Sequence, residues 1–200
     1  MDKKEFQKAI DFYRLNTLNE IENEKIVEGR FNGPRKVFTG EKLTLNHVIN
    51  PSRPIISDAD DLDIKYVSAF RMGHFNTPEE LSSAGNGTQY VGGMEFGSNL
   101  VKQKFITSTA DVATFLAEYK FGIFDLYSER EENGQTFMDI RVYECIECAQ
   151  LPNTGKPTCF FEAGLITGIF KELTKKEVIT EELRCWANGY TFCQFEVIIK

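Results

Sequence analysis

The chain has 200 residues, of which 42% are hydrophobic and 26% charged, and its formal net charge is −7 at pH 7. These proportions are typical of one soluble globular domain with a sizeable core. The acidic balance argues against direct binding to nucleic acid, because contacts to phosphate need a basic surface. No apolar run approaches the roughly 18 residues of a membrane span, and charged residues stand where a signal peptide would be apolar. We therefore expect a cytoplasmic protein.

The first half of the chain mixes helical patterns with turn signals. Residues 3–26 carry apolar side chains at helical spacing, and residues 31–56 combine turn signals with short β-prone runs. Residues 60–81 predict a short strand followed by a loop. A glycine-containing helix is expected over 86–105, where glycines indicate close packing or room for another group. A second helix is expected over 108–122, with Ser108 or Thr109 as N-cap and Gly122 as its stop.

Two hairpin signals organise the second half. Residues 123–130 and 136–145 alternate β-prone side chains on either side of Asn133-Gly134, the strongest short hairpin signal. Residues 159–176 predict a helix, and residues 177–199 predict two strands around Asn188-Gly189. Helices placed between antiparallel hairpins predict an α+β domain, in which helices pack on an antiparallel sheet.

Three cysteines near the C-terminus are candidate metal ligands. Cys185 and Cys193 lie on the two arms of the second predicted hairpin, and Cys159 opens the preceding helix, whose positive dipole end stabilises a thiolate. Glu182 would face away from Cys185 on a regular strand, so a bulge is needed to bring it to the same site. Thiolates with one carboxylate are a plausible tetrahedral zinc set. The alternative is that these cysteines are small buried core residues.

Cys145 and Cys148 form a C-x-x-C sequence at the end of a predicted strand. Such a pair can chelate a metal ion, act as a dithiol redox pair, or be two ordinary loop thiols. One of them could supply a fourth sulfur to the same metal ion. The odd, clustered set of five cysteines favours metal binding or redox chemistry over a disulfide scaffold.

Residues 157–197 resemble the signature of the 4-vinyl reductase domain family, also written vinyl-4-reductase. A cysteine opens a helix, a G-x-x-x-G run follows, and a hairpin carries E-x-x-C and a second cysteine eight residues later. Here these are Cys159, Gly164 with Gly168, Glu182 with Cys185, and Cys193. The stretch YVGGMEFGSNL is similar to the family's glycine-rich helix. The resemblance covers about residues 60–200 and is to stand-alone archaeal members.

The resemblance implies a fold similar to the small subunits of the TRAPP tethering complex. It also implies the properties of the sensor domain of phenol-responsive bacterial activators, in which three cysteines and one glutamate hold zinc. The structural zinc ligands here would be Cys159, Glu182, Cys185 and Cys193, with Cys148 as alternate ligand in a four-cysteine site. We therefore divide the chain into an N-terminal helical or irregular extension, 1–58, and a 4-vinyl-reductase-like ligand-binding domain, 59–200. A homodimer is expected, with the N-terminal helix as a candidate interface.

These features predict a sensor that binds a small hydrophobic molecule rather than an enzyme. The candidate pocket residues, each of which could equally be plain core, are Tyr90, Met94, Phe96, Phe115, Tyr119, Phe124 and Trp186. The alternative is a thiol-based redox sensor that uses Cys145, Cys148 and the zinc thiolates. Reduction of a vinyl group is less favoured, because no glycine motif for a hydride-donating nucleotide is present.

Overall fold

The computed structural model describes residues 3–40, 43–57, 61–75 and 82–200. Its centre is a four-stranded antiparallel sheet with the strand order β3-β4-β6-β5. The strands are β3 (Ile123–Glu132), β4 (Gln135–Tyr143), β5 (Val178–Arg184) and β6 (Cys193–Ile199). The central strand β6 is almost fully buried. The expected α+β class with an antiparallel sheet is confirmed.

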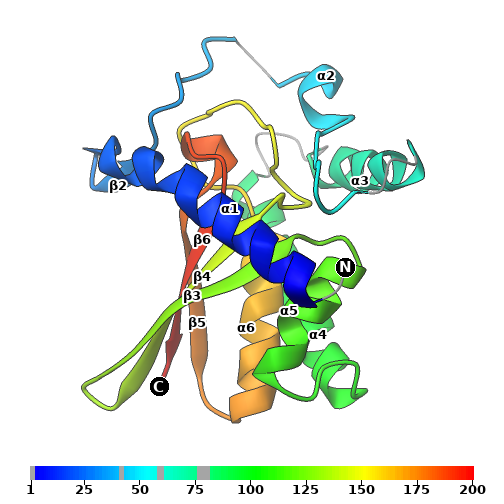
Figure 1. Cartoon of the computed structure of the whole chain (residues 1–200), viewed down its shortest axis with the longest axis vertical. Coiled ribbons are helices and arrows are strands. Elements are labelled where there is room, and N and C mark those ends of the chain that lie inside the picture. The colour runs from blue at the N-terminus through cyan, green and yellow to red at the C-terminus, as the bar shows by residue number, and fades with distance from the viewer. Residues whose placement is uncertain (1–2, 41–42, 58–60, 76–81) are drawn as a thin grey trace.

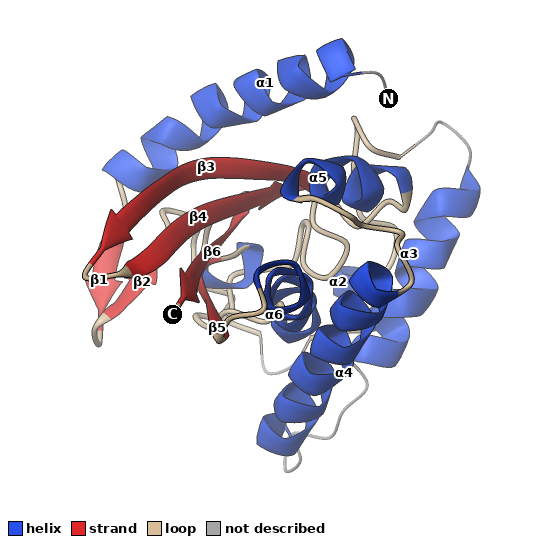
Figure 2. Ribbon diagram, turned by 90° about the horizontal axis from the view of Figure 1, so that it is seen from below, coloured by secondary structure: helices blue, strands red, loops and turns tan. Residues whose placement is uncertain are grey.

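Helices lie on both sides of this sheet. Figure 2 shows α6 (Phe160–Thr174) and α4 (Ser82–Lys102) on one side, and α1 (Lys3–Glu22) along the other side next to β3. The helix α5 (Thr109–Glu118) contacts β3, and Ser108 is its N-cap, as predicted. The smaller elements α2 (Leu45–Val48), α3 (Asp61–His74), β1 (Lys25–Val27) and β2 (Arg30–Asn32) surround one end of the sheet (Figure 1).

The helices α4 and α6 touch through their backbones. Gly93 and Gly97 of α4 face Gly164 and Gly168 of α6, and a Cβ atom on any of the four would lie closer than 3.0 Å to a carbonyl oxygen of the other helix. Real Cβ atoms essentially never approach so closely. The glycines of the predicted 86–105 helix therefore serve close helix packing.

The structure corrects the prediction for residues 60–81. The described part forms helix α3, Asp61–His74, rather than a strand and loop, and residues 76–81 lie outside the described residues. The side chains of Val67, Ser68 and Arg71 are buried, and this spacing of three to four residues is helical. Short apolar runs are ambiguous between strand and helix, which explains the error.

The two predicted hairpins differ in how they turn. The first is as expected, because Asn133 and Gly134 both adopt positive φ angles of 51° and 76° between β3 and β4. The second has both strands, but its connection is longer than a tight turn and contains a 3₁₀ helix at Trp186–Asn188. The Asn188 side chain accepts a hydrogen bond from Cys185 N at 2.6 Å, which fixes the start of this connection.

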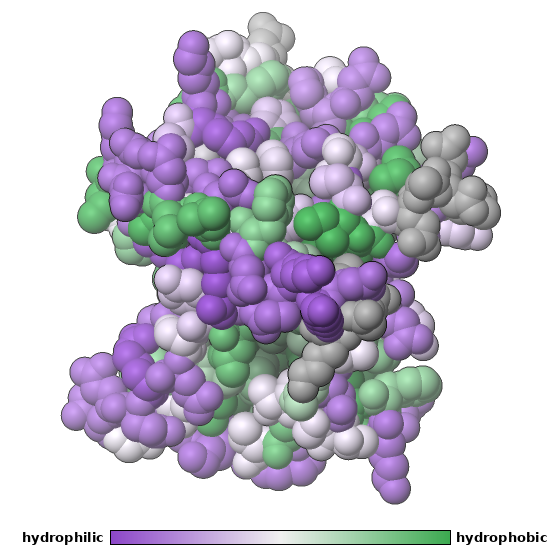
Figure 3. Space-filling model, viewed as in Figure 1, coloured by the Kyte–Doolittle hydropathy of each residue, from purple (hydrophilic) through white to green (hydrophobic). Residues whose placement is uncertain are grey.

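The N-terminal helix packs on the sheet and also presents an apolar stripe to solvent. On its inner side the Tyr13 ring stacks on Tyr143 at 4.8 Å between ring centroids. On its outer side Phe12, Leu15 and Leu18 are 55%, 72% and 46% exposed. Figure 3, viewed from the side on which α1 lies, shows hydrophobic patches among the polar side chains. The homodimer remains a prediction, which sedimentation of the purified chain would test.

Three further expectations concern this half of the chain. The helix predicted for residues 3–26 ends at Glu22, and residues 31–56 contain α2 as well as the strand β2. The predicted domain boundary between residues 58 and 59 lies at residues outside the described ranges, and the division stays a prediction. Within the described residues, every helix is too short or too polar to cross a membrane.

Candidate metal centre

All five cysteines meet at one end of the sheet. Cys145 and Cys148 lie in the segment after β4, Cys159 is the N-cap of α6, Cys185 follows β5, and Cys193 opens β6. Each of them is completely buried. The register of the sheet pairs Cys193 with Val142 near the end of β4, so the segment that carries Cys145 emerges beside it.

The bulge required by the sequence is present in β5. The pairing of β5 with β6 shifts register between Glu182 and Arg184, so Glu182 lies on the side of the cysteines. Its Oε2 atom accepts a hydrogen bond from Cys159 N at 2.9 Å. The other oxygen, Oε1, is buried without a hydrogen-bond partner among the described residues.

The distances between the sulfur atoms suit a tetrahedral ion. Cys159 Sγ lies 3.7 Å from the Sγ atoms of Cys145, Cys185 and Cys193. Zinc–sulfur bonds are about 2.3 Å long, and a regular tetrahedron of such bonds has an edge of about 3.8 Å. Cys148 Sγ and Cys193 Sγ are closer, at 3.1 Å. The donor set therefore fits a zinc ion, with small adjustments.

Two overlapping sets of four donors occupy this space. One consists of Cys159, Glu182, Cys185 and Cys193, which is the set implied by the family resemblance, and the other of Cys145, Cys148, Cys159 and Cys193. Within each set the donor atoms all lie within 4.8 Å of one another. The structure thus brings the predicted ligands and the alternate ligand Cys148 together with Cys145, which was singled out for redox chemistry.

The comparisons with known proteins agree with this arrangement. The family model of the vinyl-4-reductase (V-4-R) domain matches residues 138–199, which include β4, α6, β5 and β6. An uncharacterised protein of Methanocaldococcus jannaschii is 36% identical over 132 residues, covering 66% of this chain and 76% of that protein. The chain belongs to the vinyl-4-reductase domain family. A second uncharacterised protein of the same organism is 31% identical over 110 residues, and this chain spans only 55% of its length.

Solved structures share the fold at low sequence identity. The phenol-responsive sensory domain of the transcription activator PoxR, solved with phenol, has a TM-score of 0.54 and 14% identity, covering 93% of this chain and 89% of that one. A vinyl-4-reductase family protein of M. jannaschii has a TM-score of 0.47 and 17% identity, covering 82% and 99%. A trafficking protein particle complex subunit 3 from Naegleria fowleri has a TM-score of 0.47 and 15% identity, covering 68% and 92%. The likeness to PoxR shows a common fold.

In this vinyl-4-reductase domain, acidic groups surround the cysteines. Glu162, in the first turn of α6, accepts a hydrogen bond from Cys145 Sγ at 3.0 Å through Oε2, and its Oε1 is buried without a hydrogen-bond partner in the described structure. Glu147 accepts a hydrogen bond from Glu162 N at 2.7 Å and pairs with His74 Nε2 at 2.8 Å. With Cys159, Glu147 and Glu162 form a third compact donor group.

Burial governs the protonation of these groups. Burial raises the pKa of Glu147 to about 7, although His74 lowers it. Burial and then the neighbouring Cys145 raise the pKa of Glu162 well above its usual range, and burial and then Cys185 do the same for Glu182. Burial therefore favours the neutral carboxyl groups, and a bound divalent cation would reverse this preference.

The thiols divide into two groups by the same criterion. Burial raises the pKa values of Cys148, Cys159 and Cys193. Burial opposes ionisation of Cys145 and Cys185 too, but hydrogen bonds from neighbouring thiols lower the pKa values of these two. Five mutually close thiols cannot all ionise without a cation, whereas a coordinating thiol is deprotonated outright.

A buried arginine fixes the segment that carries Cys145 and Cys148. Arg71 of α3 donates hydrogen bonds to the carbonyl oxygens of Ile146 at 2.6 Å, Ala149 at 2.8 Å and Cys145 at 3.2 Å. Burial lowers the pKa of Arg71, while Cys148, Cys145 and Cys159 raise it. The guanidinium thus supplies positive charge beside the thiols and holds their loop in one conformation.

Several residues of the centre were missed from the sequence. His74 was interpreted as a surface or loop residue, but its side chain is only 7% exposed and faces Glu147. Glu147, inside the C-x-x-C sequence, and Glu162, a lone charge at the start of an apolar helix, offered a signal that sequence reasoning did not use. The signal was the presence of charges in segments that are otherwise buried.

The predicted pocket residues are dispersed. Tyr90 hydrogen-bonds Thr167 at 2.8 Å between α4 and α6, and Phe115 stacks on Tyr119, which is 53% exposed. Trp186 packs under the guanidinium of Arg35. The others are Met94, half-buried, Phe96, 38% exposed, and Phe124, buried.

Proposed function

We propose that this vinyl-4-reductase domain binds a small hydrophobic molecule and that a structural zinc ion clamps its α6 helix to the sheet. The observation that carries the ligand-binding part is a cavity of about 410 Å³ between α1, α5, β3 and α6. Sites for small molecules commonly have about 300–1,000 Å³ and are mostly apolar with a few polar anchors.

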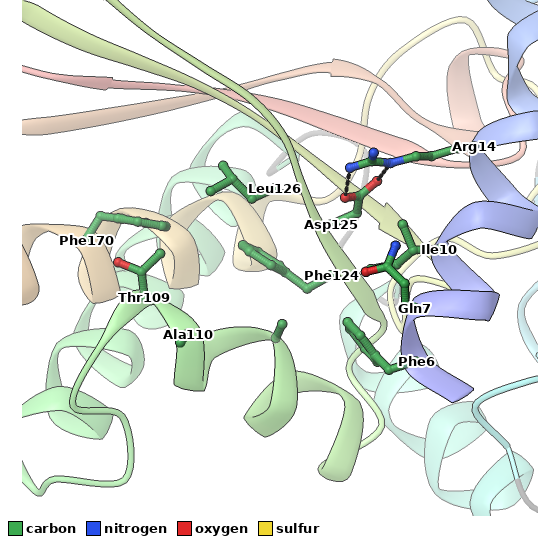
Figure 4. Close-up of a pocket in the computed structure, with 11 residues that line it drawn as sticks. Phe6, Gln7, Ile10, Arg14, Thr109, Ala110, Phe124, Asp125, Leu126 and Phe170 are labelled. Atoms are coloured by element: carbon green, nitrogen blue, oxygen red, sulfur yellow. Dashed lines mark hydrogen bonds and ion pairs between the residues drawn. The ribbon is translucent and has the colours of Figure 1, made fainter. Parts of the chain in front are cut away.

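The lining of this cavity suits a compact molecule that is largely apolar. Its side chains are Phe6, Gln7, Ile10, Arg14, Thr109, Ala110, Ala113, Phe124, Asp125, Leu126 and Phe170. Phe124 is the predicted pocket residue among them. Figure 4 shows Phe124 between α5 and α1, with the Arg14–Asp125 ion pair at one side. Asp125 accepts two hydrogen bonds from Arg14, at 2.6 and 2.8 Å.

The cavity wall continues into the metal centre. Asp125 also accepts a hydrogen bond from the Tyr143 hydroxyl at 3.2 Å, and Tyr143 lies two residues before Cys145. Glu144, between them, accepts hydrogen bonds from the Tyr13 hydroxyl and from Ile55 N at 2.9 Å. A ligand in the cavity would therefore contact elements that are fixed by the metal centre and by α1.

Zinc is the ion that the donors favour. Thiolates are soft ligands, and a site with four protein ligands is closed to water and substrate, which favours a structural role. Such an ion would hold the end of β5, the start of β6 and the first turn of α6 through side chains of Cys185, Cys193 and Cys159.

Filling the cavity should abolish ligand binding without unfolding the domain. We expect phenol and cyclohexanol, used as probes at millimolar concentration, to raise the melting temperature of the wild type, because a ligand that binds only the native state stabilises it. The Ala113→Trp variant should show no such increase, whereas Ala84→Trp, on an exposed part of α4 away from the cavity, should match the wild type. Equal increases in both variants would place binding elsewhere.

A thiol-based redox sensor is the second candidate, and one contact favours it. The sulfur atoms of Cys148 and Cys193 are 3.1 Å apart, about 1 Å more than a disulfide bond. Oxidised glutathione should then convert this pair to a disulfide, consuming two thiols and releasing two molecules of glutathione per disulfide formed. Thiol counting after oxidation tests the idea, and an equal loss of thiols in wild type and Cys148→Ser would contradict it.

A further inference from the structure

The metal centre holds more donors than one tetrahedral ion can use. Five sulfur atoms and the Glu182 carboxylate are all buried in the same space, and a single ion would leave two of the six unused. Each of the two four-donor sets is complete by itself. They share two members, Cys159 and Cys193, so they describe two tetrahedra with one common edge.

The shared edge has the dimensions of a thiolate bridge. Cys159 Sγ and Cys193 Sγ are 3.7 Å apart. If both sulfurs bind two ions at about 2.3 Å each, the two ions lie about 3 Å apart on opposite sides of that edge. Cys185 and Glu182 would complete one ion, and Cys145 and Cys148 the other.

We propose that the centre binds two thiophilic divalent cations, bridged by Cys159 and Cys193, with Cys145 and Cys148 as the terminal ligands of the second ion. This inference rests on the proposed function, because the first ion is the structural zinc described above. The second site has ligands of soft thiolate type only, which suits zinc or another divalent d-block ion.

The surroundings of Cys145 and Cys148 support a second site. Arg71 holds three carbonyl oxygens of their loop, so both thiols are kept in position by contacts that do not involve the first ion. The carboxyl group of Glu162 is buried, has one unpartnered oxygen in the described structure, and points its other oxygen at Cys145 Sγ. Such a carboxyl group orients a metal-bound thiolate from outside the ligand shell.

The charges are compatible with two ions. Five thiolates and the Glu182 carboxylate carry six negative charges, and two divalent cations leave a net charge of −2. Two buried guanidinium groups, Arg71 and Arg35, lie close enough for the cysteines to raise their pKa values. Both donate hydrogen bonds to backbone carbonyl oxygens, so their positive charge is available to the centre.

Metal stoichiometry tests the proposal directly. Protein purified in reducing, chelator-free buffer should contain about two ions per chain by inductively coupled plasma mass spectrometry. The double variant Cys145→Ser/Cys148→Ser keeps the whole first set and should fold with about one ion per chain. The matched control is Thr180→Ala, which alters a buried polar residue of β5 outside both donor sets and should retain two.

Cobalt substitution tests the bridge. Two Co²⁺ ions joined by thiolates couple magnetically, so the electron paramagnetic resonance signal per cobalt should fall when the second equivalent binds. In the double variant the signal per cobalt should stay constant up to one equivalent.

The failures of the two proposals are distinguishable. One ion per chain in both the wild type and the double variant would overturn the second site and leave the structural ion in place. A folded double variant without metal would also overturn it, because the single ion would then belong to the Cys145 and Cys148 set. A wild type without any metal would overturn the zinc clamp as well.

Discussion

The Cys159→Ser variant is expected to lose its metal and to unfold with a free energy lower by more than about 4 kcal/mol. Cys159 belongs to all three donor groups, so no alternative set can form without it. Serine is a favoured residue at a helix N-cap, so the start of α6 should not suffer from the substitution itself. Denaturant unfolding, with metal analysis of the same sample, measures both effects.

Chelation provides the control for this prediction. A strong chelator should destabilise the wild type by a similar amount and should leave Cys159→Ser unchanged, because the variant has no ion to lose. A further decrease in the stability of Cys159→Ser on chelation would show that its metal remained bound. Equal stability of wild type and variant would refute the structural role of the ion.

The Gly168→Ala variant should lose more than about 3 kcal/mol of unfolding free energy. A Cβ atom at this position would overlap the carbonyl oxygen of Met94 in α4, and backbone atoms cannot move aside as a flexible side chain can. The helices would have to separate, which opens the core between α6 and the sheet. Thermal and denaturant unfolding of the purified variant measure the loss.

Gly92→Ala is the matched control in the same pair of helices. A Cβ atom on Gly92 has nothing within 4 Å, and alanine is the better helix former by about 1 kcal/mol. The Gly92→Ala variant should therefore be as stable as the wild type or slightly more stable. If both substitutions changed stability equally, the close backbone contact between α4 and α6 would not be an important contribution.

The sequence predicted the fold best where one local cause decides the structure. Asn133-Gly134 adopts the positive φ angles that a tight hairpin needs, and Ser108 caps α5. Glu182 required a bulge to reach the cysteines, and β5 has an irregularity at that point. These features depend on a few neighbouring residues, so the sequence carries most of the information.

Prediction failed where tertiary contacts decide. The segment of α3 has an apolar run that suits a strand, but Arg71 reaches the carbonyl oxygens of the Cys145 segment only from a helix packed there. The composition of the metal centre was incomplete for the same reason. Glu147 and Glu162 join it through the pairing of α6 with the end of β4, a contact between distant segments that no spacing reveals.

The helix α1 has two faces with different neighbours. Through Phe6, Ile10 and Arg14 it forms one wall of the cavity, and through Leu15 and its exposed neighbours it faces solvent. A partner that recognises the outer face of the seated helix would bind more tightly once a ligand inside holds the helix in place. Thermodynamic linkage then requires that the partner raise the affinity for the ligand by the same factor.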